Sequence, residues 1–496
     1  MDRDFYLAFD MGAASGRAFL GELKNDHIQV QEIDRFKNRM TLKQGHLVWD
    51  VYDILEEIKT GLRKYGNDHS EPLSSMAIDT WGVDFGLFDS QGDLISLPFA
   101  YRDKRNKKAM EEFLKIISPE KIYELTGIQL LQFNSIFQLY AVKTQDPEIM
   151  DKAEDLLFMP DIFNYFLTGK MLTEFSYATT SQLFNPQTYK WEEKLFKALD
   201  VPVSIMQKVD AAGQKIGLIK ESTAEKMGIR PVPLVLTATH DTACAVTAVP
   251  ANGEEWAFIS SGTWSIMGVE LDSPLITEES YRLNFTNEGS PGHRFRLSKN
   301  IAGLWLLQEC QKKWSFKKDI NHEELTKKGQ SAKAFQFFVD PDHALFLKPP
   351  DMTEAIAQFC KKTRQAYPKK ISEFVRCILE SLALKCRMVF DELCFLSPKD
   401  IKKIYIIGGG SHNQVLCQFT ANALGIPVIA GPAEATAVGN IMIQALTDNK
   451  VDSLESMRTV ISNSFDPQVY EPESIEIWKR NYERFQEICE QGHRFE

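Results

Sequence analysis

Short apolar runs that end in small or polar residues recur along this chain and predict buried strands. The first run, Phe5 to Phe9, leads through the small-residue segment 10–17 into a second apolar run. An apolar strand, a turn of small residues and another apolar strand are typical of a β-hairpin. A similar pattern spans residues 256–269. The two halves of the chain therefore begin alike, and this weak internal duplication predicts two related domains.

Segments with apolar residues three and four positions apart predict helices between the strands. The apolar residues of 54–62 would form one face of a helix that Asp50 or Asp53 can cap. The same spacing predicts a long helix over residues 372–396. The strand Ile404 to Ile407 leads into a run of three glycines and then another helix. This succession is how α/β proteins approach a nucleotide, although glycine turns are also common.

The most distinctive chemistry follows the apolar run Pro233 to Ala238, where the chain reads Thr239-His240-Asp241-Thr242. This places a carboxylate beside a histidine at the end of a buried strand, the position at which open α/β sheets commonly carry their functional residues. Asp241 is therefore a candidate general base. The alternative is that Asp241 only caps the following helix, since Asp is a preferred N-cap residue.

Two other strand ends carry candidate ligand contacts. Asp10 closes the first strand and could hold a hydrated divalent cation, while the turn after it could bring backbone N–H groups to a phosphate. A plain hairpin is the alternative for this segment. Gly82 interrupts two strands, and such a glycine often marks the close approach of a ligand or another backbone. Trp81 beside it could pack against a sugar or lie in the core. Residues 300–308 predict the start of a helix, with Gln308 about two turns in.

The charge balance argues against a nucleic-acid partner. The chain of 496 residues has 57 Lys and Arg against 68 Asp and Glu, a net charge of −11, and no long basic run. Its 44% hydrophobic and 25% charged residues are ordinary for a globular protein, and its length suggests roughly two to four domains.

Cysteine usage and hydropathy predict a cytoplasmic protein. All eight cysteines lie at or after Cys244, without the spacing of a metal site, which indicates a reducing compartment. We find neither a signal peptide nor an apolar run of membrane-spanning length.

Six stretches together resemble the FGGY carbohydrate kinases, within the actin/hexokinase/Hsp70-like nucleotide-binding fold. They are DMGAASGR (10–17), IDTWGVDF (78–85), THDTA (239–243), SSGTWS (260–265), KNIAGLWLLQ (299–308) and GGGSHN (408–413). The resemblance spans nearly the whole chain. It implies an α/β, ribonuclease H-like fold of two duplicated mixed-sheet domains with a cleft between them. Residues 1–246 would bind the sugar and carry the first phosphate hairpin, and residues 247–496 would bind the nucleotide.

Carried over residue by residue, the resemblance implies a role for each motif. Asp241 would be the catalytic base and Asp10 would lie near Mg²⁺. The residues implied to bind the sugar are Gly82, His240, Asp241, Thr242 and Asn300. Those implied to bind ATP are Ala13, Ala14, Ser15, Gly16, Arg17, Thr263, Gln308, Gly409 and Gly410, and Asn413 would approach the adenine.

Two residues depart from the family's pattern. Ala14 stands where many relatives carry serine, which removes a possible hydroxyl contact to phosphate and leaves that contact to backbone N–H groups and Ser15. His412 is an unusual residue after the glycines.

The function implied is phosphoryl transfer from MgATP to the 1-hydroxyl of L-rhamnulose. The open alternatives are L-fuculose or another ketose or polyol as the substrate, and a non-catalytic ATP switch of the actin or Hsp70 kind. A Rossmann dehydrogenase is disfavoured, because no strand is followed by GxGxxG with an acidic residue about 20 positions on. The expected partners are the sugar and MgATP, without nucleic acid or membrane, for a monomer or homodimer.

Overall fold

The computed structural model describes residues 3–315 and 322–495, and the chain divides into two compact units. The first unit comprises Met1–Asn252, Glu270–Leu297 and Ala435–Ser464; the second comprises Gly253–Val269, Ser298–Glu434 and Phe465–Glu496. Two segments from the second half of the sequence therefore fold with the first unit. The domain division at residues 246 and 247 stays a prediction from the sequence.

A six-stranded mixed sheet forms the centre of the first unit. Its order is β13 (Gln214–Leu218), β14 (Pro233–Leu236), β6 (Ser75–Thr80), β1 (Asp4–Met11), β2 (Ser15–Lys24) and β3 (His27–Lys37). The predicted first hairpin is confirmed: β1 pairs antiparallel with β2, and on its other side β1 runs parallel to β6. Almost every residue of β1 is buried, so both faces of the sheet are covered.

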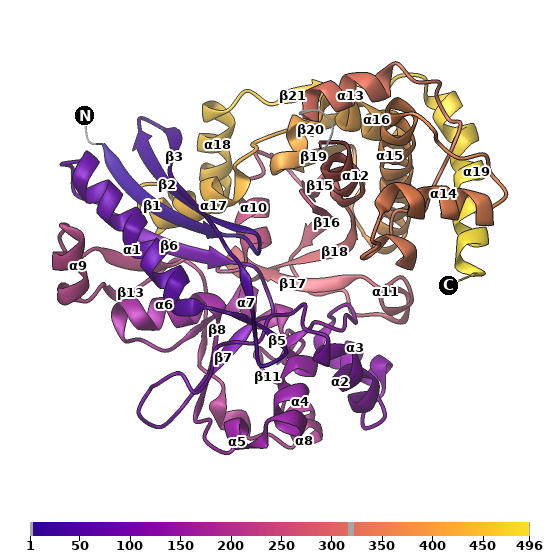
Figure 1. The fold of residues 1–496 in the computed structure, drawn as a ribbon. Helices are drawn as coiled ribbons and strands as arrows, with labels where there is room; N and C mark the ends of the chain where they lie inside the picture. Colours follow the sequence, from indigo (N-terminus) through magenta and orange to yellow (C-terminus); the bar gives the residue numbers. More distant parts are fainter. Residues whose placement is uncertain (1–2, 316–321, 496) are drawn as a thin grey trace. The chain divides into compact units, whose positions relative to one another are not determined.

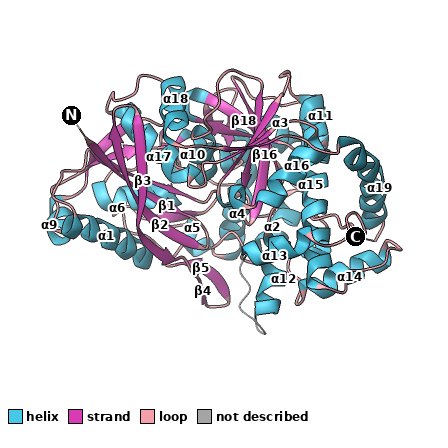
Figure 2. Ribbon diagram, turned by 90° about the horizontal axis from the view of Figure 1, so that it is seen from above, coloured by secondary structure: helices cyan, strands magenta, loops and turns pink. Residues whose placement is uncertain are grey.

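Helices from distant parts of the sequence cover the two faces. On one face, Leu7 and Phe9 pack with α1 (Val51–Asp68) and α6 (Met159–Thr168). Alternate residues of β1 point to the other face, which α17 (Ala435–Thr447) covers. Figures 1 and 2 show α17 and α18 (Leu454–Ser464) beside β1, β2 and β3. The predicted cap of α1 is confirmed, since the Asp50 carboxylate accepts from Asp53 N at 3.3 Å.

The remaining elements of the first unit are short helices and small ladders. The helices are α2 (Arg105–Phe113), α3 (Pro119–Thr126), α4 (Ser135–Gln145), α5 (Pro147–Met150), α7 (Phe175–Thr180), α8 (Glu193–Leu199), α9 (Glu221–Met227), α10 (Asp241–Thr247) and α11 (Glu278–Arg282). The strands are β4 (Met40–Lys43), β5 (His46–Trp49), β7 (Phe85–Phe88), β8 (Asp155–Phe158), β9 (Thr173–Glu174), β10 (Phe184–Asn185), β11 (Lys190–Trp191) and β12 (Val209–Asp210).

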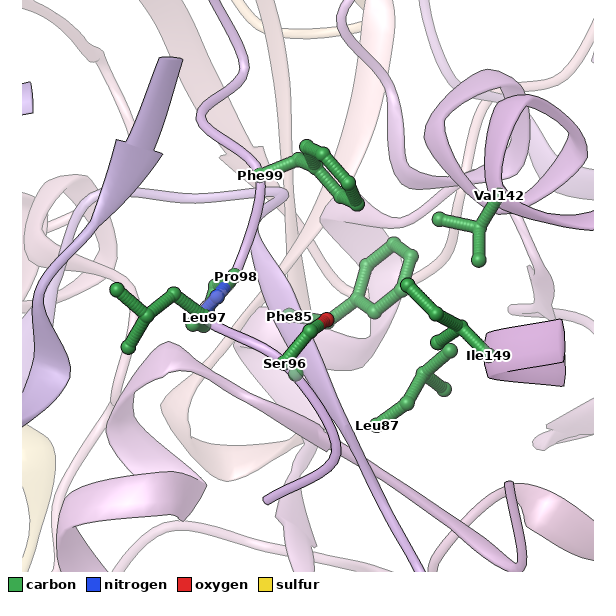
Figure 3. Close-up of a pocket in the computed structure, with 9 residues that line it drawn as sticks. Phe85, Leu87, Ser96, Leu97, Pro98, Phe99, Val142 and Ile149 are labelled. Atoms are coloured by element: carbon green, nitrogen blue, oxygen red, sulfur yellow. The ribbon is translucent and has the colours of Figure 1, made fainter. Parts of the chain in front are cut away.

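A small cavity lies among these elements, between β7 and α4 (Figure 3). Phe85, Phe99 and Val142 are among the mostly apolar residues that line it. Its volume of about 10 Å³ is near the smallest that can hold one water molecule. None of the predicted site residues lines this cavity, so it is a packing defect and not the candidate site.

The second unit repeats the strand order of the first. Its sheet runs β21 (Gln468–Tyr470), β20 (Val428–Ala430), β19 (Lys403–Ile407), β15 (Trp256–Ser261), β16 (Trp264–Leu271) and β18 (Arg294–Ala302), and a seventh strand, β17 (Thr286–Ser290), pairs with β18 at its edge. As in the first unit, the first two strands form an antiparallel hairpin, here β15 with β16. On its other side β15 runs parallel to β19. The two mixed sheets confirm the duplicated α/β architecture predicted from the sequence.

Helices flank this second sheet. They are α12 (Trp305–Ser315), α13 (His322–Gln330), α14 (Met352–Lys362), α15 (Ile371–Leu396), α16 (Gln414–Leu424) and α19 (Ile475–His493). The long helix predicted over residues 372–396 is confirmed as α15. Within residues 3–315 and 322–495, no helix is both long and apolar enough to span a membrane.

The predicted start of a helix at Asn300 is wrong. Residues 300–302 end strand β18, and α12 begins only at Trp305. Gly303 marks the break, because a Cβ there would lie 2.6 Å from Gly262 O. This close approach lets Leu304 N donate to Gly262 O at 3.0 Å. Gln308 consequently lies in the first turn of the helix.

The contact between α10 and α17 depends on one glycine. A Cβ on Gly439 would lie 1.9 Å from Cys244 O, a backbone atom that cannot move without displacing α10. Because α10 carries Asp241, this packing fixes the position of the candidate base.

We therefore expect Gly439→Ala to lower the free energy of unfolding by about 1–3 kcal/mol or more through overpacking, despite the higher helix propensity of alanine. Denaturant unfolding measures the effect. Ser462→Ala, at an exposed position of α18, is the control. A Gly439→Ala protein as stable as this control would contradict the close contact.

Candidate active site

The ends of three neighbouring segments bring five predicted residues together in the first unit. β1 ends beside Asp10, β6 leads to Gly82, and the loop after β14 leads through His240 to Asp241 and Thr242 at the start of α10. Thr80 N donates to Thr239 O at 2.9 Å, which ties that loop to the end of β6. The side chains therefore gather at the carboxyl edge of the parallel strands, as expected for an open α/β sheet.

Asp241 is the first residue of α10, and His240 occupies the N-cap position. The interpretation of Asp241 as a mere N-cap is therefore wrong. Its Oδ1 accepts from Thr242 N at 2.6 Å and from Thr242 Oγ1 at 3.1 Å, and 29% of the side chain remains exposed. Burial, with the charge of Asp10, raises the pKa of Asp241 to about 7. A carboxylate with this pKa suits proton abstraction near neutral pH.

His240 lies directly beside this carboxylate. Its Nε2 is 3.4 Å from Asp241 Oδ1, and a Cβ on Gly82 would lie 3.4 Å from the same nitrogen. Burial lowers the pKa of His240 to about 4, so the imidazole is neutral at pH 7. Arg296 and Glu288 contact the other ring nitrogen. Sequence reasoning missed both, because the alternation of residues 294–297 is typical of a strand whose arginines lie on the polar face.

Asp10 forms an ion pair with Arg17, whose Nη2 lies 2.5 Å from Asp10 Oδ2. The strand register also places Asp10 opposite Asp79 of β6. Asp79 is fully buried and accepts from Asn440 Nδ2 at 2.6 Å. Burial and the charge of Asp10 raise the pKa of Asp79 well above its usual value. A carboxylate inside the apolar run 76–80 was a sequence signal that we did not use.

The turn of the first hairpin is braced from within the first unit. Gly12 N donates to Ser15 O at 3.0 Å, and Asn38 Nδ2 donates to Gly12 O at 2.6 Å. Gly16 packs against the Phe36 ring, whereas Ala13 and Ala14 are at least partly exposed at the tip. The predicted phosphate contacts therefore lie on a fixed turn that presents backbone and not long side chains.

The nucleotide residues predicted in the second unit also lie together. Thr263 Oγ1 donates to Gln308 Oε1 at 3.2 Å. A Cβ on Gly410 would lie 2.0 Å from Ser261 Oγ, whereas a Cβ on Gly409 would meet nothing within 4 Å. The glycine loop, residues 408–410, thus packs with one side on the hairpin of β15 and β16 and is open on the other side.

Two predicted residues of the second unit have distinct positions. Asn413 caps α16, because its Oδ1 accepts from Leu416 N at 3.0 Å. Asn300 is half-buried in β18. Its assignment to the same sugar site as Gly82 and His240, which belong to the first unit, stays a prediction.

A strained turn follows Gly82. Val83 has φ +73°, and Asp84 N donates to Gly82 O at 3.1 Å. Together these features define a γ-turn with positive φ, a rare conformation for a β-branched residue. The Asp84 carboxylate anchors it by accepting from Trp49 Nε1 at 2.6 Å and Trp81 Nε1 at 2.9 Å. Burial raises the pKa of Asp84 to about 6. Trp81 is 5% exposed, so it lies in the core.

The described residues hold no all-protein metal cage. Across residues 3–315 and 322–495, no three His, Cys, Asp or Glu side chains are grouped to hold an ion. Mg²⁺ is usually held by one or two carboxylates with water and substrate phosphates. The buried carboxylate of Asp10 fits that mode of binding.

Two family descriptions match the chain. Residues 5–248 match the N-terminal domain of the FGGY family of carbohydrate kinases, and residues 257–447 match its C-terminal domain. The Rhamnulokinase of Bacteroides thetaiotaomicron is 43% identical over 480 residues, covering 97% of this chain and 98% of the relative. The Rhamnulokinase of Bacillus subtilis is 36% identical, covering 95% and 96%.

Solved structures share the fold at low sequence identity. The gluconate kinase from Lactobacillus acidophilus has a TM-score of 0.83 at 15% identity, covering 99% of this chain and 98% of that one. The glycerol kinase from Plasmodium falciparum, solved with ADP, has a TM-score of 0.80 at 16% identity, covering 99% and 98%.

The Asp84 cluster yields a stability prediction. Both indoles donate to Asp84 Oδ2, whereas Gln138 Nε2 donates to Oδ1 at 2.9 Å. Asp84→Asn can keep one oxygen for the indoles, but it turns its N–H₂ group toward the Gln138 donor, so we expect the free energy of unfolding to fall by about 1–3 kcal/mol. Chemical denaturation measures it, and Glu111→Gln, an exposed acid of the same unit, is the control. Equal stability of the two variants would show that the carboxylate does not hold the turn.

Proposed function

Because the chain belongs to the FGGY family of carbohydrate kinases, we propose that it transfers the γ-phosphoryl group of ATP to the 1-hydroxyl of L-rhamnulose. The products are L-rhamnulose 1-phosphate and ADP. The kinase activity follows from the family. The sugar is supported by relatives named Rhamnulokinase at 43% and 36% identity over nearly the whole chain. No similar observation favours L-fuculose.

The observation that carries the mechanism is the partly exposed carboxylate of Asp241. It accepts the proton of the sugar hydroxyl as that oxygen attacks the phosphorus in line, which requires a separation of about 2.6–3.2 Å. The transition state of phosphoryl transfer is loose, so the enzyme acts mainly by positioning and by stabilising charge. The neutral His240, with Gly82, Thr242 and Asn300, positions the sugar.

Binding of the nucleotide falls to the two hairpin turns and the glycine loop. Backbone N–H groups of residues 13–17 meet the phosphates, and Thr263, Gln308, Gly409 and Gly410 hold the nucleotide. Asp10 is the residue that would hold Mg²⁺. When bound, the ion neutralises charge on the phosphates.

The proposed setting is the cytoplasm, where the enzyme acts as a monomer or homodimer without nucleic acid or membrane. The net charge of −11 supports the absence of a nucleic-acid partner. All eight cysteines are free, as expected in a reducing compartment.

A coupled ADP-release assay tests the substrate. With MgATP we expect kcat/KM for L-rhamnulose to exceed that for L-fuculose, L-ribulose, D-xylulose and glycerol by roughly 100-fold, about 2.7 kcal/mol of transition-state discrimination. A preference for L-fuculose would overturn the sugar but keep Asp241 as the base. ADP release that needs no sugar would instead support an ATP switch.

Replacing the base separates binding from chemistry. We expect Asp241→Asn to bind ATP with unchanged affinity and to lose at least about 100-fold in kcat, because the amide cannot accept the proton. Calorimetry with ATP and the coupled assay measure the two effects. Asp93→Asn, an exposed acid in a turn, is the control. A near-normal kcat for Asp241→Asn would rule out the general base.

The pH profile of the unmodified enzyme is a second measure of the same assignment. A base must be deprotonated, and burial raises the pKa of Asp241 to about 7. We therefore expect kcat/KM to be level above pH 7 and to fall about tenfold per pH unit below it. A profile that stays level down to pH 5 would contradict this environment of the carboxylate.

A further inference from the structure

Arg296 is a fully buried cation behind the candidate site. Its Nη2 lies 2.9 Å from Glu288 Oε2 and 3.2 Å from His240 Nδ1, and its Nη1 donates to Gly289 O at 2.6 Å and Ser290 Oγ at 3.2 Å. Burying a guanidinium is costly unless it is paired and hydrogen-bonded. These four contacts hold the group in one orientation, with one arm directed at the histidine.

The direction of the Arg296–His240 hydrogen bond decides the state of the histidine. A guanidinium has only donors, so His240 Nδ1 must accept. A neutral imidazole carries one proton, which then lies on Nε2. Glu288 could favour the opposite tautomer, since its Oε2 lies 3.4 Å from Nδ1, but that oxygen accepts the shorter bond from Arg296.

The Nε2–H group faces the place where ligand chemistry is proposed. Nε2 lies 3.4 Å from Asp241 Oδ1, beyond the usual length of an N–H···O hydrogen bond. Gly82 contributes no side chain on this side, and even a Cβ there would remain 3.4 Å away. The backbone of His240 is held as well, because its N donates to Ser176 Oγ at 3.4 Å.

We propose that Arg296 is a positioning residue that fixes His240 as the Nε2–H tautomer, so that His240 donates a hydrogen bond to a sugar oxygen adjacent to the attacking hydroxyl. The identity of that acceptor rests on the proposed function; the tautomer does not. The arrangement selects a substrate with an acceptor oxygen, such as a carbonyl, next to the hydroxyl that Asp241 deprotonates.

Nitrogen NMR of the full-length protein labelled with ¹⁵N-histidine tests the tautomer without any substrate. The chain has nine histidines, and His240→Gln identifies the signal. We expect a protonated Nε2 and an unprotonated Nδ1 at pH 7. Arg296→Met should move the proton to Nδ1, where Glu288 can accept it. Arg294→Gln, two residues earlier in β18 and paired with Asp272, should leave the signal unchanged.

A wild-type signal with Nδ1 protonated, or with both nitrogens protonated, would overturn the proposal. A folded Arg296→Met protein that keeps the Nε2–H tautomer would do so too. Where Arg296→Met fails to fold, the wild-type spectrum and Arg296→Lys, which keeps the cation opposite Glu288, still decide the matter.

Kinetics give the functional half of the test. We expect Arg296→Met to lower kcat/KM for the sugar by roughly tenfold or more, the value of one hydrogen bond to the substrate, while the KM for ATP stays unchanged. Glu288→Gln keeps Arg296 as the donor to His240 Nδ1, so its kcat/KM for the sugar should fall less than that of Arg296→Met. An equal loss toward sugar and ATP would indicate a merely structural role. If the Nε2–H tautomer is found but no sugar drives ADP release, the proposed function fails, while the role of Arg296 in fixing the tautomer of His240 stands.

Discussion

The burial of several carboxylates at the carboxyl ends of the parallel strands is the constraint on which the first unit depends. The register of β1 and β6 places Asp10 opposite Asp79, and Asp241 feels the charge of Asp10. Like charges in a poorly solvated region raise one another's pKa and destabilise the fold unless partners are supplied. Arg17, Asn440 and the hydrogen bonds of Thr242 supply them.

This constraint explains why a late segment of the chain folds with the first unit. Helix α17 brings Asn440 to Asp79 and packs so closely on α10 that position 439 must be glycine. The strained turn at Val83 has a similar origin, since the buried Asp84 carboxylate and its indole donors hold a conformation that a valine would not adopt by itself.

Duplication of the sheet separates two kinds of chemistry. Where the first unit ends its central strands in carboxylates, the second ends β15 in Ser260 and Ser261 and follows β19 with glycines. Carboxylates can exchange a proton with a hydroxyl, whereas hydroxyls and open backbone suit the many acceptor oxygens of a nucleotide. One strand order thus carries both the proposed base and the proposed nucleotide-binding surface.

The sequence by itself determined the two hairpins and the duplication, because apolar periodicity depends on neighbouring residues. It also determined the family resemblance, including the motif that carries Asp241, because such motifs are local. It misplaced the start of α12, since Gly303 ends the strand through contact with a turn about 40 residues earlier. The partners of His240 were equally out of reach, because Glu288 and Arg296 lie 48 and 56 residues away along the chain. Only the tertiary structure decided which charges face one another, and these contacts underlie both the shifted pKa values and the proposed tautomer of His240.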